Sequence, residues 1–223
     1  MKRKVIYKVN IMALLVFLPV MLYMCKNSKY SDFIINDSFE QIDGQINGYD
    51  YVDLGLPSGL KWATCNVGAS SPSEYGNYYA WGEVEPKSSY EGGNNVTNGK
   101  EIGDISGNPQ YDAARANWGG TWRMPTKIEF EELIDNCTWR WMGKLGYKGY
   151  MVTGPNGNSI FLPAAGYRYG TSLYYAGSYG YYWSSTPFES YTQLAYRLYF
   201  NSDFHDTNWS GRYYGRSVRP VSE

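Results

Sequence analysis

The joint abundance of tyrosine and glycine is the feature that most constrains the fold. The 223 residues include 24 Tyr and 25 Gly, and aromatic residues make up 18% of the chain. Both residue types fill long helices poorly, so a helical bundle is not expected. Disordered chains contain few aromatic residues, so simple disorder is not expected either. The chain is long enough for one well-buried core, or at most two small ones.

The net charge and the small number of metal-binding residues make several classes of function unexpected for this chain. The 20 Lys and Arg nearly balance the 21 Asp and Glu, which leaves a net charge of −1. This balance does not predict binding to nucleic acid or to an anionic membrane surface. With one His and three Cys, we expect neither a multi-ligand zinc site nor an iron–sulfur cluster, and no cofactor.

Residues 1–25 have the pattern of an export signal. Four basic residues precede an uncharged, mostly apolar run over residues 11–24, which is shorter than the ~20 residues that span a bilayer. The stretch Leu22-Tyr23-Met24-Cys25 resembles a bacterial lipoprotein box, although Met24 stands where a small residue is expected. We therefore expect an exported lipoprotein with Cys25 lipidated, at the outer membrane or cell surface, or facing the periplasm. An uncleaved or otherwise cleaved signal and a buried helix remain as alternatives.

The interpretation of the segment after Cys25 and of the other two cysteines depends on this export signal. Polar residues and glycine dominate residues 26–48, which predicts a flexible tether. If Cys25 carries a lipid, Cys65 and Cys137 are left as an even pair in an oxidising compartment. We expect a disulfide between them; the alternative is two buried thiols that never meet.

The remaining residues, 49–223, predict a single α+β domain of short antiparallel strands, a few short helices and long loops. A short helix is predicted over residues 109–117 with Asn108 as its cap, after a long loop over residues 86–109. A second helix over residues 127–136 begins with a capping box formed by Thr126 and Glu129. The predicted strands are residues 51–54, 60–67, 78–84, 150–153, 159–162, 181–185, 195–200 and 217–221.

Two local patterns in this β-rich part are specific. Residues 155–158, Pro-Asn-Gly-Asn, predict the turn of a hairpin. Period-two alternation along residues 195–201 predicts one set of side chains for the core and the other for solvent. The two sets are Tyr196, Leu198 and Phe200 for the core, and Arg197, Tyr199 and Asn201 for solvent.

Four segments together resemble a known family. They are Tyr51-Val52-Asp53-Leu54-Gly55-Leu56-Pro57-Ser58-Gly59-Leu60-Lys61-Trp62-Ala63, Trp118-Gly119-Gly120-Thr121-Trp122-Arg123-Met124-Pro125-Thr126, Tyr182-Trp183-Ser184-Ser185 and Ser217-Val218-Arg219-Pro220-Val221. In this order they resemble the Fibrobacter succinogenes major paralogous domain over residues 49–222. That family is similar to the C-type-lectin-like fold and to the formylglycine-generating enzymes. The resemblance implies a compact α+β domain whose two ends lie close together.

The catalytic role of those enzymes does not carry over. They use a cysteine pair near the C-terminus, and this sequence has no Cys after Cys137. The sequence also lacks a G-x-S-x-G motif and a Cys–His pair with a third member. We therefore expect a protein that is not an enzyme, with a divergent enzyme on the same fold as the less favoured alternative.

A narrower resemblance concerns residues 167–214, which are similar to the variable region of retroelement-diversified bacterial proteins. Residues 147–223 hold 14 of the 24 Tyr but one Lys, Lys148. Adenine-directed mutation of Asn codons reaches Tyr, Asp, Phe and Arg but not Lys or Trp, so Trp183 and Trp209 would be fixed scaffold. The residues that fit the reachable set are Tyr169, Tyr174, Tyr175, Tyr179, Tyr191, Arg197, Tyr199, Asp203, Phe204 and Asp206.

The composition of this segment independently predicts a binding surface. A mixture of Tyr, Ser, Gly and Asn with occasional Arg and Trp is typical of paratopes and interface cores. We predict a ligand-binding face on one side of the domain, for a protein or glycan ligand. Its residues are Tyr169, Tyr174, Tyr175, Tyr179, Tyr191, Arg197, Tyr199, Phe204 and Trp209. Tyr167, Tyr182 and Tyr196 are predicted for the core instead.

Two further alternatives remain at this stage. His205, the single histidine, is expected to be a surface residue rather than a metal ligand with Asp203 and Asp206, and the oxygen-rich residues 201–208 fit no calcium or zinc motif. A structural envelope or adhesion subunit is the alternative to a ligand-binding protein, with the membrane contacted through the N-terminal anchor.

Overall fold

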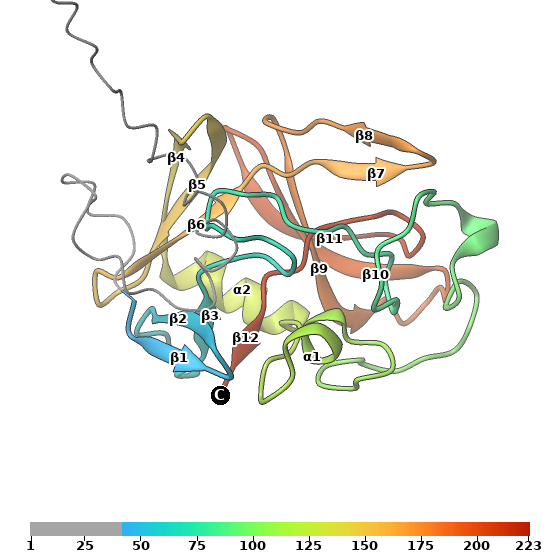
Figure 1. The fold of residues 1–223 in the computed structure, drawn as a ribbon, viewed down its shortest axis with the longest axis horizontal. Helices are drawn as coiled ribbons and strands as arrows, with labels where there is room; N and C mark the ends of the chain where they lie inside the picture. The colour runs from blue at the N-terminus through green and yellow to red at the C-terminus, as the bar shows by residue number, and fades with distance from the viewer. Residues whose placement is uncertain (1–41) are drawn as a thin grey trace, which may run out of the picture.

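The computed structural model describes residues 42–223, drawn in colour in Figure 1. The predicted export signal, Cys25 and most of the predicted tether lie outside the described residues. No helix within the described range is both long and apolar enough to cross a membrane.

Short antiparallel strands and two short α-helices build the described part, as the α+β prediction expected. The first sheet has the order β1 (Gly44–Ile46), β2 (Tyr49–Asp53), β3 (Lys61–Ala63) and β12 (Val221–Ser222). The second comprises β4 (Thr138–Lys144), β5 (Tyr147–Thr153) and β6 (Ser159–Pro163), and the third β9 (Gly180–Pro187), β10 (Leu194–Phe200) and β11 (His205–Gly211). A hairpin of β7 (Tyr167–Tyr169) and β8 (Ser172–Tyr174) forms the fourth.

The first sheet joins the two ends of the described chain. Strand β12 pairs with β3 through Val221 and Trp62, so the last strand lies in the sheet that also contains the first one (Figure 1). This confirms the expectation that the two ends lie close together. Strand β1 pairs with β2 although residues 44–46 were predicted as tether, so the folded part begins earlier than residue 49.

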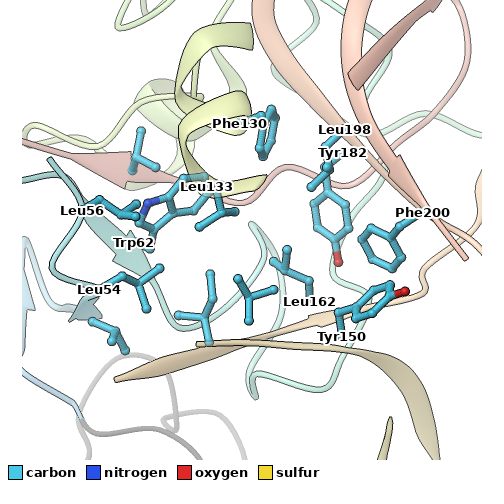
Figure 2. Close-up of a cluster of buried hydrophobic side chains, with 14 of the residues drawn as sticks. Leu54, Leu56, Trp62, Phe130, Leu133, Tyr150, Leu162, Tyr182, Leu198 and Phe200 are labelled. Atoms are coloured by element: carbon cyan, nitrogen blue, oxygen red, sulfur yellow. The ribbon is translucent and has the colours of Figure 1, made fainter. Parts of the chain in front are cut away.

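The helix α2 (Lys127–Asn136) carries the main core. Thr126 accepts a hydrogen bond from the backbone N–H of Glu129, whose carboxylate accepts from the backbone N–H of Thr126, which confirms the predicted capping box. Phe130 and Leu133 are the buried residues of this helix. In Figure 2 they lie in one cluster with side chains from the first three sheets and from the loop after β2. The labelled members are Leu54, Leu56, Trp62, Tyr150, Leu162, Tyr182, Leu198 and Phe200.

Several predicted elements differ from the structure, among them one strand and the first helix. The predicted strand over residues 78–84 is irregular, because the carbonyl oxygen of Trp81 accepts from side chains, Thr97 and Asn95, rather than from a strand. The first helix, α1, is Ala113–Trp118 and begins later than predicted. Its cap is Asp112, which accepts from two backbone N–H groups, whereas Asn108 caps only a turn at Gln110.

The prediction of a Cys65–Cys137 disulfide is wrong. Cys137 is a free, half-buried thiol at the end of α2, where it packs against the cluster of Figure 2. Cys65 belongs to a different buried cluster, with Trp81 and Trp122. The two side chains therefore lie in separate parts of the core.

Candidate binding face

The hairpin β7–β8 lies beside one side of the β9–β10–β11 sheet, while α2 contacts the same sheet (Figure 1). Alternation along β10 separates these two sides. Leu198 and Phe200 are fully buried in the α2 cluster, so the intervening residues Arg197 and Tyr199 point to the hairpin side. Tyr199 pairs across the sheet with Tyr181 of β9, which places both rings on that side.

Tyrosine rings link the hairpin to the sheet. The ring of Tyr167 lies 5.3 Å from Tyr181, 5.6 Å from Tyr174 and 5.2 Å from Tyr214, all measured between ring centroids. We call the connected set the tyrosine face. It consists of Tyr167, Tyr169, Tyr174, Tyr175, Tyr179, Tyr181, Arg197, Tyr199, Phe204, Tyr213, Tyr214 and Arg216.

Glycine allows the hairpin to approach this closely. Gly166, immediately before β7, has a φ of 65°, and a Cβ atom there would lie 2.1 Å from the carbonyl oxygen of Tyr174. Tyr175, immediately after β8, also has a positive φ, 57°, which is costly for a bulky side chain. The fold therefore keeps a large exposed ring at a position where Gly or Asn would fit the backbone better.

The tyrosine face has an exposed layer and a covered layer. Exposed to solvent are Tyr169, Tyr174, Tyr175 and Phe204, together with the hairpin residue Leu173. The rings of Tyr181 and Tyr214 are half-buried beneath them, and Arg216 is buried, with 3% of its surface exposed. The exposed rings are thus connected through half-buried rings of the same face, on a base that contains two arginines.

Burial determines the electrostatics of the covered layer. The pKa of Arg216 is held well below its usual value by burial and, second, by the positive charge of Arg197. Burial also lowers the pKa of Arg197 and raises that of Tyr181. Arginine stays protonated in proteins even so. The base of the face therefore carries two like charges in a poorly hydrated place.

Arg197 corrects one prediction from the strand pattern. It was predicted for solvent, but its guanidinium lies 4.4 Å from the ring centroid of Tyr199 and 5.0 Å from that of Tyr181. The residue is half-buried, and so is Tyr199. The alternation was correct, but the outward side of β10 is covered by rings from distant segments.

The predicted ligand-binding residues divide between two places. Tyr169, Tyr174, Tyr175, Tyr179, Arg197, Tyr199 and Phe204 belong to the tyrosine face. Tyr191 and Trp209 do not: both rings contact Phe188, in what we call the Phe188 patch. Trp209 pairs with Tyr196, whose alternation with Leu198 places it on the α2 side, under Lys127. The prediction of one shared face is therefore wrong for these two residues.

Some members of the face were missed or assigned to the core. Tyr182 is fully buried as predicted, whereas Tyr167 and Tyr196 are half-buried. Tyr213, Tyr214 and Arg216 were not predicted. Two adjacent tyrosines between Gly211 and Gly215 were the available signal, because small flanking residues often present large rings.

His205 is not a simple surface residue. Its ring is half-buried and stacks on Trp139 with centroids 4.4 Å apart. Burial lowers the pKa of His205, and the neighbouring Asp206 raises it by less. Within residues 42–223 no three His, Cys, Asp or Glu side chains group closely enough to hold a metal ion.

Comparison with known proteins bears on the same segment. A family model described as a domain of unknown function (DUF8237) matches residues 151–221. No curated protein and no solved structure matches the chain significantly. The matched residues include β7 to β11 and Arg216, so the whole tyrosine face lies in the segment that resembles this family.

Proposed function

We propose that this chain is an exported, lipid-anchored binding protein whose tyrosine face holds a protein or glycan ligand without catalysing a reaction on it. The observation that carries the proposal is that four exposed residues, Tyr169, Tyr174, Tyr175 and Phe204, belong to one connected set of aromatic side chains. Soluble proteins rarely expose connected aromatic side chains unless these bind something. The export signal and the lipid on Cys25 are part of the proposal and place this surface outside the cytoplasm.

The backbone at Tyr175 supports a role in binding. Tyr175 is 56% exposed, so the core gains little from it, while its positive φ costs stability. A residue that is unfavourable for the backbone and unneeded for the core is best explained by a contact with a partner. Tyrosine suits that contact because it offers a large, rigid surface with few rotatable bonds.

The arrangement of strands supports a finer assignment of fold and family. We propose that the domain has the C-type-lectin-like fold and belongs with the Fibrobacter succinogenes major paralogous domain. The paired first and last strands and the irregular residues between β3 and α1 suit that fold. We also propose that residues 167–214 are a retroelement-diversified variable region, since the face draws most of its rings from this segment. A near-repeat of these codons beside a reverse-transcriptase gene would support it.

The binding role is tested by capture on arrays of glycans and purified bacterial surface proteins. The full chain is compared with Tyr174→Ala and with Tyr175→Asn, which removes a ring but suits a positive φ. Loss of an interface anchor costs about 2 kcal/mol or more, so capture should weaken about 30-fold or more. Melting should change little, as for other surface substitutions.

Ile128→Ala is the matched control. Ile128 is 74% exposed on α2, away from the tyrosine face, so its loss removes a similar apolar surface elsewhere. This variant should capture ligands as the parent does. Equal capture by all four proteins would contradict the proposed binding face.

A further inference from the structure

The side chain of Arg216 lies across the hairpin side of the β9–β10–β11 sheet. Its backbone pairs with Tyr79, and its guanidinium lies 4.4 Å from the ring centroid of Trp183 on β9. Nη2 donates to Oγ of Ser210 on β11 over 2.7 Å, so the side chain spans the sheet. Nε and Nη1 are buried and have no hydrogen-bond partner.

The guanidinium of Arg197 lies beside that of Arg216 and also lacks hydrogen-bond partners for two of its nitrogen atoms. These two atoms, Nε and Nη1, are buried. The guanidinium carbons of Arg197 and Arg216 lie 5.0 and 5.2 Å from the centroid of one ring, that of Tyr181. None of the ion pairs among the described residues includes either arginine. Two neighbouring cations therefore share an aromatic enclosure without an acidic partner.

The other two buried arginines show that the fold can satisfy a guanidinium. Arg212 donates to the carbonyl oxygens of Leu194, Thr97 and Lys100. Arg219 donates to three backbone carbonyl oxygens and to Oδ1 of Asn66. Among the described arginines, only Arg197 and Arg216 leave two buried nitrogen atoms without a hydrogen-bond partner. Tyrosine rings offset part of their charge but accept few of their N–H groups.

We propose that Arg197 and Arg216 form an anion site that takes a carboxylate or sulfate group. The oxygens of carboxylate and sulfate groups accept hydrogen bonds from guanidinium N–H groups, and a negative charge relieves the repulsion between the two arginines. Arg197 is half-buried, so the group reaches it from the solvent side, with Arg216 behind it. The anion is free in solution or is carried by an acidic ligand; the second case rests on the proposed function of the tyrosine face.

The site is tested by following the Nε–H signals of arginine in ¹⁵N-labelled full chain. Sodium sulfate and sodium acetate replace sodium chloride at constant ionic strength, and Arg197→Lys and Arg216→Lys assign the two signals. Both signals should shift and saturate, whereas those of Arg212 and Arg219 should stay in place. Unmoved signals, or equal drift of all four, would overturn the site.

The source of the anion is separated by a second titration, with glucuronate and with neutral glucose. If the anion is carried by a ligand, glucuronate should saturate the arginine signals at a lower concentration than acetate. In that case only acidic ligands should be captured on the arrays, and Arg197→Met should weaken their capture about tenfold. If the anion is free in solution, glucuronate and acetate should saturate the arginine signals at equal concentrations, and Arg197→Met should leave ligand capture on the arrays unchanged.

The two proposals fail separately. If the arginine signals do not shift but ligand capture depends on Tyr174, the anion site is refuted and the proposed binding face stands. Saturable arginine signals with capture insensitive to Tyr174 would keep the anion site and refute the binding face.

Discussion

Nε of Arg219 donates a hydrogen bond to Oδ1 of Asn66 over 2.9 Å, which ties the last segment of the chain to the residues that follow β3. The same guanidinium also donates to the carbonyl oxygens of Ala63, Thr64 and Phe161. One fully buried cation thereby satisfies acceptors from segments far apart in the sequence. The positive charge is stabilised by oriented carbonyl dipoles, together with the Asn66 side chain.

Replacing this arginine should therefore destabilise the whole domain. Arg219→Met fills a similar volume but leaves several buried carbonyl oxygens without donors, so the free energy of unfolding should fall by about 3–5 kcal/mol. Urea denaturation followed by tryptophan fluorescence measures the change. Lys148→Met, at an exposed position, should change stability by less than about 0.5 kcal/mol. Similar curves for both variants would contradict the prediction.

The start of α2 offers a second test, with a smaller effect. Thr126→Ala removes the hydroxyl that accepts from the N–H of Glu129, and should lower the free energy of unfolding by about 1 kcal/mol. Thr126→Ser retains a hydroxyl in the same place and serves as the control, with most of the stability kept. If serine proved as damaging as alanine, the threonine methyl rather than the cap would be the important group.

These examples show what could be predicted from the sequence. The capping box depends on residues three positions apart, so Thr126 and Glu129 were sufficient to place α2 correctly. The Pro155–Asn158 turn and the alternation of β10 are equally local. By contrast, β4 and β11 were missed because their pairing partners, rather than a clear pattern of their own, make them strands. The burial of Arg197 depends on Tyr181 and on the hairpin, which no pattern within β10 reveals.

The candidate face was predictable in composition but not in arrangement. An excess of tyrosine in residues 167–214 indicated a surface, and the exposed rings of Tyr174 and Tyr175 agree with it. The separation of Trp209 from these rings follows from its pairing with Tyr196, which is a matter of register. Arg216 could not be predicted because its role depends on Ser210 and Trp183, which it reaches only in the folded sheet.

His205 gives the fold a defined dependence on pH. Burial lowers its pKa in the folded state below the ordinary 6.5, so the unfolded chain binds the proton more readily. The free energy of unfolding should therefore be highest above pH 6.5, fall as pH decreases from 6.5 toward the folded-state pKa, and level off below it. His205→Phe preserves a ring against Trp139 and should remove this component. Because His205 is the single histidine, the difference between parent and variant from pH 7.5 to 5 isolates it; parallel curves would refute the assignment.

Removing one of the two unpaired arginines should stabilise the protein. Arg197→Met keeps the length of the side chain and its contact with Tyr199, but removes the charge that lowers the pKa of Arg216. At low ionic strength the free energy of unfolding should rise by about 1 kcal/mol, because replacing buried charge with a well-packed apolar group is often favourable. Sulfate should reduce this gain, since an anion bound by the parent neutralises the same repulsion. Arg212→Met is the contrasting variant: its guanidinium donates to three carbonyl oxygens, so its loss should cost about 3 kcal/mol in either salt. Destabilisation of similar size in both variants would mean that the charge of Arg197 is balanced within the fold and that its aromatic enclosure needs no anion.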